Sequence, residues 1–591
     1  MFFTEHTKIG YILASPKGRE ILLKHAPELL DSPYIFFIKM KGLSDFVTAN
    51  QSINRSEDWL RTVMSELSGV EYEIDTNTEI LPLSNYESDR IPVGCAEIVA
   101  AESVGKWDVF EIELHGPSHG NPFVDVAINS QFSCDGYSVD INGFYDGNGT
   151  YKIRFMPEKE GQWSYRTNSN ARSLDGIEGQ FTCDPANDTN NGPVRVSDTF
   201  HFSYSDGTRY IPVGTTCYAW THQPIELEEQ TLATLSNGPF NKLRMCIFPK
   251  AYLYNENEPI QYPFAGSLEE GWDYTRFNPI FFQHLDQRIT ELKKLGIEAD
   301  LILFHAYDRW GFSEMGKSAD DRYLKYVSAR LSAFSNVWWS LANEYDIMWS
   351  KEEEDWERFA SIVTNHDPYN HLISIHNCFN FYDYTKPWVT HCSVQRVDVY
   401  RTSENTDEWR KQWGKPVVID ECGYEGNINM GWGNIPGEEM VRRFWEGAIR
   451  GGYVGHGETY MHPEDILWWS KGGELHGTSP SRISFLRNVV EQSPNGILNP
   501  IVSEWDAPAA GIVDKFYLYY YGFNQPSYRE FTTSPGIQYK VDVIDTWNMT
   551  IEEQEGTYEG NFRIELPARQ YMAIRLKAVA LKALSYQTGV Q

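Results

Sequence analysis

The sequence predicts a multidomain protein of mixed α/β and β class. We expect a central (β/α)8 TIM barrel flanked by two antiparallel β-sandwiches, with a small helical domain at the N-terminus. One supporting observation is that the hydrophobic period changes three times along the 591 residues. Another is a long middle segment in which eight apolar, β-rich runs alternate with amphipathic helical stretches. Such a barrel typically takes about 250 residues, and at about 100–200 residues per domain the chain has room for several more domains.

Residues 1–90 are predicted to form a small helical module. Apolar residues recur at helical spacing around Pro16, which suits the first turn of a helix. A later helix is expected between an N-cap at Ser56 and a stop at Gly69. No residue in this segment suggests chemistry, so we expect it to serve packing or homo-oligomerisation.

Two other segments, 95–190 and 500–591, are predicted to be β-sandwiches. Apolar and polar residues alternate in short runs, such as FEIELH in the first segment and KFYLYYY in the second. Turn sequences such as DGNG separate the runs. Short strands at this spacing are typical of antiparallel sandwiches.

The segment 200–495 is predicted to be the barrel. Its eight apolar runs are residues 210–220, 241–249, 299–308, 336–346, 372–377, 390–397, 416–423 and 452–460. Nearly continuous apolar strands that alternate with helices form a parallel sheet covered on both faces. A doubly wound open sheet is the alternative, but no glycine-rich phosphate loop follows the first run.

Composition excludes several classes of partner. Lys and Arg total 51 against 82 Asp and Glu, a net charge of −31, whereas nucleic acids and anionic membranes require a basic surface. No stretch approaches the length of about 18 apolar residues that a membrane span needs, and MFFTEHTKIG lacks the pattern of a signal peptide. The 8 cysteines include no CxxC pair. We therefore expect a cytoplasmic protein with reduced thiols, and its 14% aromatic content suggests carbohydrate as a ligand.

Polar residues at the ends of the predicted strands are the candidates for catalysis, because TIM-barrel active sites lie there. Strand four ends in Asn343 and Glu344, and strand seven ends in Asp420 and Glu421. These strands lie on opposite sides of a barrel mouth, so the two glutamates should face each other, as cleavage of a glycosidic bond requires. Arg244 on strand two could keep one of them ionised. No metal-ligand or cofactor motif is present, so neither a metal nor an organic cofactor is expected.

Other polar and aromatic residues at strand ends are candidates for substrate binding. Glu458 also reaches the predicted mouth and is the rival of Glu421 as the second carboxylate. Asp308 and Asp346 are interpreted as structural. The remaining candidates for the wall of a sugar pocket are His305, His376, Trp220, His222, Trp432, Trp468 and Trp469.

The motifs WSLANEYD (339–346) and VVIDECG (417–423) resemble clan A of the retaining glycoside hydrolases. The resemblance implies that Glu344 is the acid/base, that Asn343 binds the 2-hydroxyl of the substrate, and that Glu421 is the nucleophile supported by Arg244. A longer resemblance runs from about residue 100 to 500 and includes FEIELHGPSHGNPFVDV, GHGETY and ILWWSKGGELHG. This longer resemblance is to a group of uncharacterised bacterial glycosidases related to the apiosidase-like family. Members of the group carry a β-sandwich on each side of the barrel.

The predicted function is that of a retaining, exo-acting glycoside hydrolase. Its substrates would be small oligosaccharides or plant glycosides, with pentofuranosides included because of the likeness to apiosidases. An endo-acting glycanase of the cellulase or mannanase type is one alternative. A non-catalytic carbohydrate-binding protein is another, although both carboxylates and Arg244 are in place. A purely structural assembly role rests only on residues 1–90.

Overall fold

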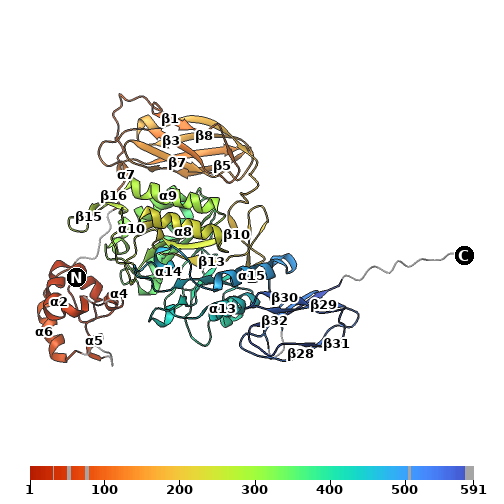
Figure 1. The fold of residues 1–591 in the computed structure, drawn as a ribbon. Helices are drawn as coiled ribbons and strands as arrows, with labels where there is room; N and C mark the ends of the chain where they lie inside the picture. Colours follow the sequence, from red (N-terminus) through yellow and green to blue (C-terminus); the bar gives the residue numbers. More distant parts are fainter. Residues whose placement is uncertain (31, 33, 49–54, 73–78, 503–506, 580–591) are drawn as a thin grey trace.

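The computed structural model describes all residues except 31, 33, 49–54, 73–78, 503–506 and 580–591. Figure 1 shows a central α/β body with a β-sandwich above it, a helical module at its left and a second β domain at its lower right. The order of these parts along the chain is the predicted one.

The central body is a parallel barrel. Its strands are β13 (Gly214–Thr216), β14 (Lys242–Cys246), β17 (Glu298–His305), β18 (Val337–Asn343), β19 (Ile373–Ser374), β20 (Cys392–Gln395), β21 (Val417–Glu421) and β23 (Tyr453–His456). They pair in the order β19-β18-β17-β14-β13-β23-β21-β20. A parallel bridge between His376 and Ser393 joins the two outer strands and closes the sheet. The predicted (β/α)8 fold is therefore confirmed, and the open doubly wound sheet is wrong.

Helices surround the barrel because their apolar sides pack on the outer face of the sheet. They are α8 (Ile225–Asn237), α9 (Pro279–Lys294), α10 (Lys317–Leu331), α11 (Glu353–His366), α12 (Thr406–Trp413), α13 (Gly437–Ile449) and α15 (Ser479–Glu491). Helix α9 begins at Pro279, and Asn278 before it accepts a hydrogen bond from the backbone N–H of Ile280 at 3.2 Å. One β/α unit lacks its helix, since the stretch 375–391 between β19 and β20, which is fully described, contains none.

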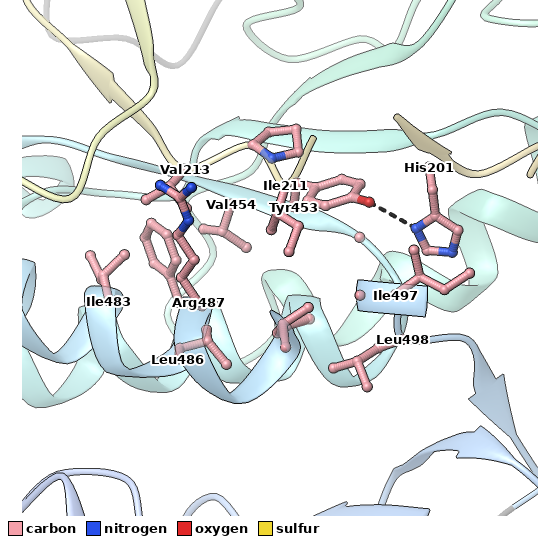
Figure 2. Close-up of a pocket in the computed structure, with 17 residues that line it drawn as sticks. His201, Ile211, Val213, Tyr453, Val454, Ile483, Leu486, Arg487, Ile497 and Leu498 are labelled. Carbon is pink, nitrogen blue, oxygen red and sulfur yellow. Dashed lines mark hydrogen bonds between the residues drawn. The ribbon is translucent and has the colours of Figure 1, made fainter. Parts of the chain in front are cut away.

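A small antiparallel sheet covers the floor of the barrel, and the sequence did not predict it. It consists of β10 (Val194–Ser197), β11 (His201–Tyr204) and β12 (Arg209–Tyr210). Phe202 packs on Trp338 and Tyr453, near the starts of β18 and β23, with both ring centroids 5.4 Å away. A cavity of about 40 Å³ lies close by, where His201 and the Tyr453 hydroxyl are hydrogen-bonded at 2.8 Å (Figure 2). Its lining is mostly apolar, and it lies at the end of the barrel opposite to the strand ends that carry the candidate residues.

The first β-sandwich packs on α9 and α10. One sheet has the order β1-β3-β7-β6 and the other β2-β9-β8-β4-β5. The strands are β1 (Glu97–Ala100), β2 (Ser103–Gly105), β3 (Phe110–His115), β4 (Ile128–Cys134), β5 (Tyr137–Asn142), β6 (Phe144–Tyr145), β7 (Thr150–Phe155), β8 (Gly161–Ser169) and β9 (Glu178–Asp184). Arg154 of the sandwich bonds Asp286 of α9 at 2.8 Å, and Arg330 of α10 bonds Asp146 of the sandwich at 2.7 Å. These buried, reciprocal ion pairs fix the sandwich to the side of the barrel.

The C-terminal domain packs on α13. Its main sheet has the order β25-β26-β27-β32-β29-β30, and β28 pairs with β31. The strands are β25 (Pro500–Ile501), β26 (Ala509–Ile512), β27 (Phe516–Tyr520), β28 (Tyr528–Thr532), β29 (Tyr539–Asp545), β30 (Thr550–Glu553), β31 (Asn561–Glu565) and β32 (Met572–Ala578). Tyr520 stacks on Trp445 of α13 with ring centroids 5.3 Å apart.

The N-terminal module is helical, as predicted. Its helices are α1 (Ile9–Ala14), α2 (Pro16–His25), α3 (Pro27–Leu30), α4 (Ile35–Lys39), α5 (Asp45–Thr48) and α6 (Glu57–Leu67). Ser56 caps α6 by accepting a hydrogen bond from the N–H of Trp59 at 3.1 Å. Among the described residues, no helix is both long and apolar enough to cross a membrane.

Candidate active site

Glu344 and Glu421 lie at the mouth of the barrel, where the sequence placed them. Glu421 is the last residue of β21, and Glu344 directly follows β18. Both side chains are almost enclosed, since the residues are 5% and 7% exposed. The two carboxylates are close enough for the charge of Glu421 to raise the pKa of Glu344. The structure thus brings the two predicted carboxylates together.

Glu421 is surrounded by groups that stabilise its charged form. Its Oε1 accepts a hydrogen bond from the Tyr218 hydroxyl, and it lies 3.4 Å from Arg244 Nη1 and 3.4 Å from His376 Nε2. Burial alone would raise the pKa of Glu421. The hydrogen bond and charge of His376, with the charge of Arg244, outweigh burial and hold this pKa well below its usual range.

Glu344 has fewer stabilising neighbours. Its Oε2 accepts a hydrogen bond from the Tyr307 hydroxyl. Burial, followed by the negative charge of Glu421, raises the pKa of Glu344 above its ordinary value. The backbone of Glu344 is left-handed, with φ 57° and ψ 56°, a conformation that costs a non-glycine residue about 1–2 kcal/mol. Such strain at a strand end is typical of residues whose side chain is aimed at a site.

Arg244 and Asn343 connect the two sides of the mouth. Arg244 Nη1 donates to Asn343 Oδ1 at 2.6 Å and to the Tyr218 hydroxyl at 2.8 Å. Nε and Nη2 of the same buried arginine have no hydrogen-bond partner among the described residues. Both side-chain hydrogen bonds that Asn343 makes with described residues use Oδ1, which leaves the Nδ2 amide available to a ligand.

Asp420 points elsewhere, as the alternation along β21 predicted. It bonds Lys242 Nζ at 2.8 Å, and Asp300 bonds the same ammonium at 2.5 Å. All three groups are buried in the barrel interior, and Lys242 precedes Arg244 by two residues on the same face of β14.

The interpretation of Asp308 as structural also agrees with the structure, because its carboxylate accepts hydrogen bonds from the N–H groups of Trp310, Gly311 and Ser313. Asp346 likewise accepts from three backbone N–H groups, at residues 378–380.

The two candidate histidines hold neighbouring groups. His376 lies beside Glu421, and Ser393 Oγ at 3.0 Å and Gln395 Oε1 at 3.1 Å fix its ring. The ring of His305 bonds the carbonyl of Phe248 at 3.2 Å, and burial lowers its pKa to about 3, so it stays neutral. His376 is therefore placed to orient Glu421, whereas His305 supports the loop after β14.

Aromatic rings form the wall of the site, and sequence reasoning selected only part of them. Trp469 lies 5.9 Å from Tyr218 and 5.0 Å from Trp432, measured between ring centroids. Tyr424 joins the same cluster, 6.1 Å from Trp469. Trp432 and Trp469 were predicted, whereas Tyr218 and Tyr424 were not singled out.

Lys250 is a further residue of the site that the sequence analysis missed. Its Nζ lies over the rings of Tyr218, Tyr307 and Trp469, at 3.6, 4.5 and 4.8 Å from their centroids. Lys250 follows β14 in a loop, at a position with no recognisable motif. Tyr307, by contrast, stands two residues after His305 at the end of β17, and the period of a strand could have placed both on the same side.

Three predicted wall residues belong instead to the protein core. Trp220 is fully buried, and its indole N–H donates to Met245 Sδ at 3.3 Å. The indole N–H of Trp468 donates to Oγ1 of Thr215, a residue of β13, at 2.8 Å. His222 bonds the Ile247 carbonyl at 3.1 Å and stacks on Phe281. Trp220 and Trp468 belong to the hydrophobic core of the barrel, and His222 lines a separate cavity with Phe281, so the prediction that these three residues line the sugar pocket is corrected.

Glu458 anchors a loop and does not contact Glu421. Its two oxygens accept hydrogen bonds from the N–H groups of His476 at 2.5 Å and Gly477 at 2.8 Å. Glu425 binds the next turn in the same way, through Thr478 and Ser479. With His456, these two carboxylates are the one group among the described residues whose ligand atoms lie within 4.8 Å of one another, as a metal site requires. Because backbone N–H groups already bind the carboxylates, the cluster is better explained as a loop anchor than as a metal centre.

Three family models match the chain. Residues 197–494 match the family described as "Apiosidase-like, catalytic domain". Residues 103–170 and 505–577 match two domains of unknown function, DUF5060 and DUF5605. No curated protein matches this chain.

Solved structures agree with the family match. A crystal structure from Bacteroides vulgatus ATCC 8482, described as a "putative glycoside hydrolase", is 38% identical with a TM-score of 0.78. The match covers 81% of this chain and 100% of that one. A family 5 glycoside hydrolase from the same organism is 14% identical with a TM-score of 0.53, covering 66% of this chain and 94% of that one. The latter likeness extends to the fold alone.

Proposed function

The chain belongs to the apiosidase-like family, and we propose that it is a retaining, exo-acting glycoside hydrolase. One observation carries the proposal: two enclosed glutamates face each other at the barrel mouth, and only Glu421 has an arginine beside it. A retaining glycosidase needs one ionised carboxylate and one carboxylic acid. Glu421 and Glu344 fit these two roles.

In the first step, Glu421 attacks the anomeric carbon of the bound sugar. The bond from this carbon to the leaving oxygen breaks as the new carbon–oxygen bond forms, and Glu344 gives its proton to the departing oxygen. Arg244, His376 and Tyr218 keep the attacking carboxylate ionised and oriented. The products are a free leaving group and a glycosyl ester of Glu421.

In the second step, water replaces the leaving group. Glu344, now a carboxylate, takes a proton from the water, whose oxygen attacks the anomeric carbon and displaces Glu421. Free sugar leaves with its original configuration, and both glutamates return to their starting protonation states. The Nδ2 amide of Asn343 is placed to bind a sugar hydroxyl during both steps.

The enclosure of the site favours exo action on small substrates. An endo-acting enzyme holds a long chain across an open cleft, whereas both carboxylates here are at least nine-tenths buried. We therefore propose small oligosaccharides or plant glycosides as substrates. The family to which the catalytic domain belongs adds pentofuranosides to the sugars that need testing.

The test is a panel of aryl glycosides, pentofuranosides included, assayed with the wild-type protein and with Glu421→Ala. We expect one sugar to be hydrolysed and the variant to lose turnover while remaining folded. Azide should restore part of the cleavage, because it can attack from the face that Glu421 has vacated. A fully active Glu421→Ala would overturn the assignment.

Two further expectations from the sequence remain proposals. A cytoplasmic location is supported by the free thiols of all 8 cysteines. Association of two chains through residues 1–90 is testable by sedimentation, where a monomer at micromolar concentration would contradict it.

A further inference from the structure

Helix α4 of the N-terminal module lies against the mouth of the barrel. The ring of Phe36 contacts those of Tyr307 and Tyr252, with centroids 4.9 and 6.0 Å away. Phe36 is only 6% exposed, although it is more than 200 residues away in sequence from both tyrosines. The next residue, Phe37, packs on Phe379 at 5.7 Å.

A large cavity lies between the module and the barrel. Its volume is about 630 Å³, within the range of about 300–1,000 Å³ that is typical of ligand pockets. Phe36, Ile35 and Lys39 line it from the module. Tyr252 and Tyr307 line it from the barrel, so both components contribute aromatic rings.

Tyr307 connects this cavity to the chemistry. Its ring lines the cavity, and its hydroxyl donates a hydrogen bond to Glu344. In the proposed reaction Glu344 protonates the leaving oxygen, so the leaving group must extend from Glu344. Tyr307 is thus shared by the cavity and the Glu344 side of the site, so the cavity adjoins the side from which the leaving group would extend.

Further contacts, several of them with Trp349 in the wall of the cavity, fix the module in this position. Lys8 bonds Glu352 at 2.6 Å and the carbonyl of Trp349 at 3.1 Å. The ring of Tyr11 packs edge-on against Trp349 at 5.1 Å. These contacts hold the module, and α4 with it, against the barrel.

We propose that the N-terminal module completes the leaving-group site and that Phe36 determines which leaving groups fit. The proposal rests on the function proposed above. A sugar or aromatic aglycone would occupy the cavity and contact the ring of Phe36. The module is thus a specificity element of the enzyme, beyond the packing or oligomerisation that its sequence suggested.

The experiment compares two substrates that share the sugar found active in the panel. One is the 4-methylumbelliferyl glycoside, whose bulky aromatic leaving group would fill the cavity, and the other is the glycosyl fluoride, whose leaving group is a single atom. Phe36→Ala should lower kcat/KM for the first about tenfold, as truncating an aromatic anchor does, and change the second less than twofold. Phe2→Ala is the control, because it removes an exposed ring from the same module without lining the cavity, and it should leave both rates unchanged.

Phe36→Leu keeps apolar bulk but loses the ring, so it serves as a second variant in case Phe36→Ala misfolds. It should show a smaller loss of kcat/KM, again only for the 4-methylumbelliferyl glycoside. The alkaline limb of the pH profile should not move in either Phe36 variant, which separates loss of contact from an effect through Tyr307 on Glu344. Equal losses on the two substrates, or none on either, would overturn the inference while leaving the hydrolase assignment intact. A wild-type protein that cleaves neither substrate, with no active sugar in the panel, would instead overturn the proposed function.

Discussion

The two sides of the barrel mouth carry the same residue in opposite environments. Glu421 and Glu344 are both glutamates, both almost fully buried and both at a strand end. The Glu421 side has a guanidinium, an imidazole and a hydroxyl, and the pKa of Glu421 is lowered. The Glu344 side has a tyrosine hydroxyl as its hydrogen-bond donor, and burial with the charge of Glu421 raises its pKa. Because both glutamates are almost equally buried, the groups around each of them, and not burial, decide which one is the nucleophile and which one is the acid.

Removing the acid gives the largest expected effect after loss of the nucleophile itself. Glu344→Ala should lower the rate for substrates with poor leaving groups about 10³-fold, within the range of general acid catalysis. Substrates whose leaving group departs without protonation should lose far less in the first step. Rates measured across a series of aryl glycosides of rising leaving-group pKa check this expectation, and equal losses across the series would contradict it.

Removing the cation from the Glu421 side should make the two environments more alike. Arg244→Met deletes the charge that helps to lower the pKa of Glu421, so this pKa should rise. The acidic limb of kcat/KM should then move to higher pH, with a rate loss of about 10²-fold. Lys242→Met serves as a control for a buried cation on the same strand, since it pairs with Asp300 and Asp420 and not with Glu421. If the acidic limb stays in place in Arg244→Met, the arginine does not set the charge of the nucleophile.

A smaller effect is expected from the hydroxyl on the Glu344 side. The hydrogen bond from Tyr307 favours the ionised form of Glu344 and so lowers its pKa. Tyr307→Phe removes this bond, the pKa of Glu344 should rise, and activity should persist to higher pH. A pH profile of kcat/KM tests this, with a loss of only a few-fold expected at the optimum. An alkaline limb that moves to lower pH would contradict the assignment.

The smallest effect is expected at a third glutamate, Glu458. Burial raises its pKa to about 7, and its two bonds go to backbone N–H groups of the loop that it anchors. Glu458→Gln should leave kcat/KM within about twofold of the wild-type value, because Glu458 lies outside the catalytic site. It should lower the melting temperature by a few degrees. A loss of activity as large as that of Glu421→Ala, in a folded variant, would make Glu458 the second carboxylate.

The sequence predicted the parts of this site that sit on strands. Asn343, Glu344 and Glu421 were found because the ends of parallel strands converge on one mouth, and Arg244 because its strand was recognised. Trp468 and Trp469 show where this reasoning stops. They are adjacent, yet Trp468 lies in the core and Trp469 lies in the wall of the site. Packing against distant strands decides which of the two rings faces the core.

Some residues contributed by loops, and those of the remote module, could not be predicted from the sequence. Lys250 and Tyr252 follow β14 in a loop whose path no periodic pattern specifies. Phe36 belongs to a helix of 5 residues in a separate module. Its contact with Tyr307 depends on how two domains dock, and no local property of either segment encodes that contact.

The central claim is that Glu421 becomes covalently bonded to the sugar. The most direct measurement uses the 2-deoxy-2-fluoro analogue of the active sugar with a good leaving group, followed by mass spectrometry of the intact protein and its peptides. We predict a mass increase of one sugar residue, located at Glu421, and no such increase in Glu421→Ala. A label on another residue, or hydrolysis with inversion of configuration and no label, would contradict the account.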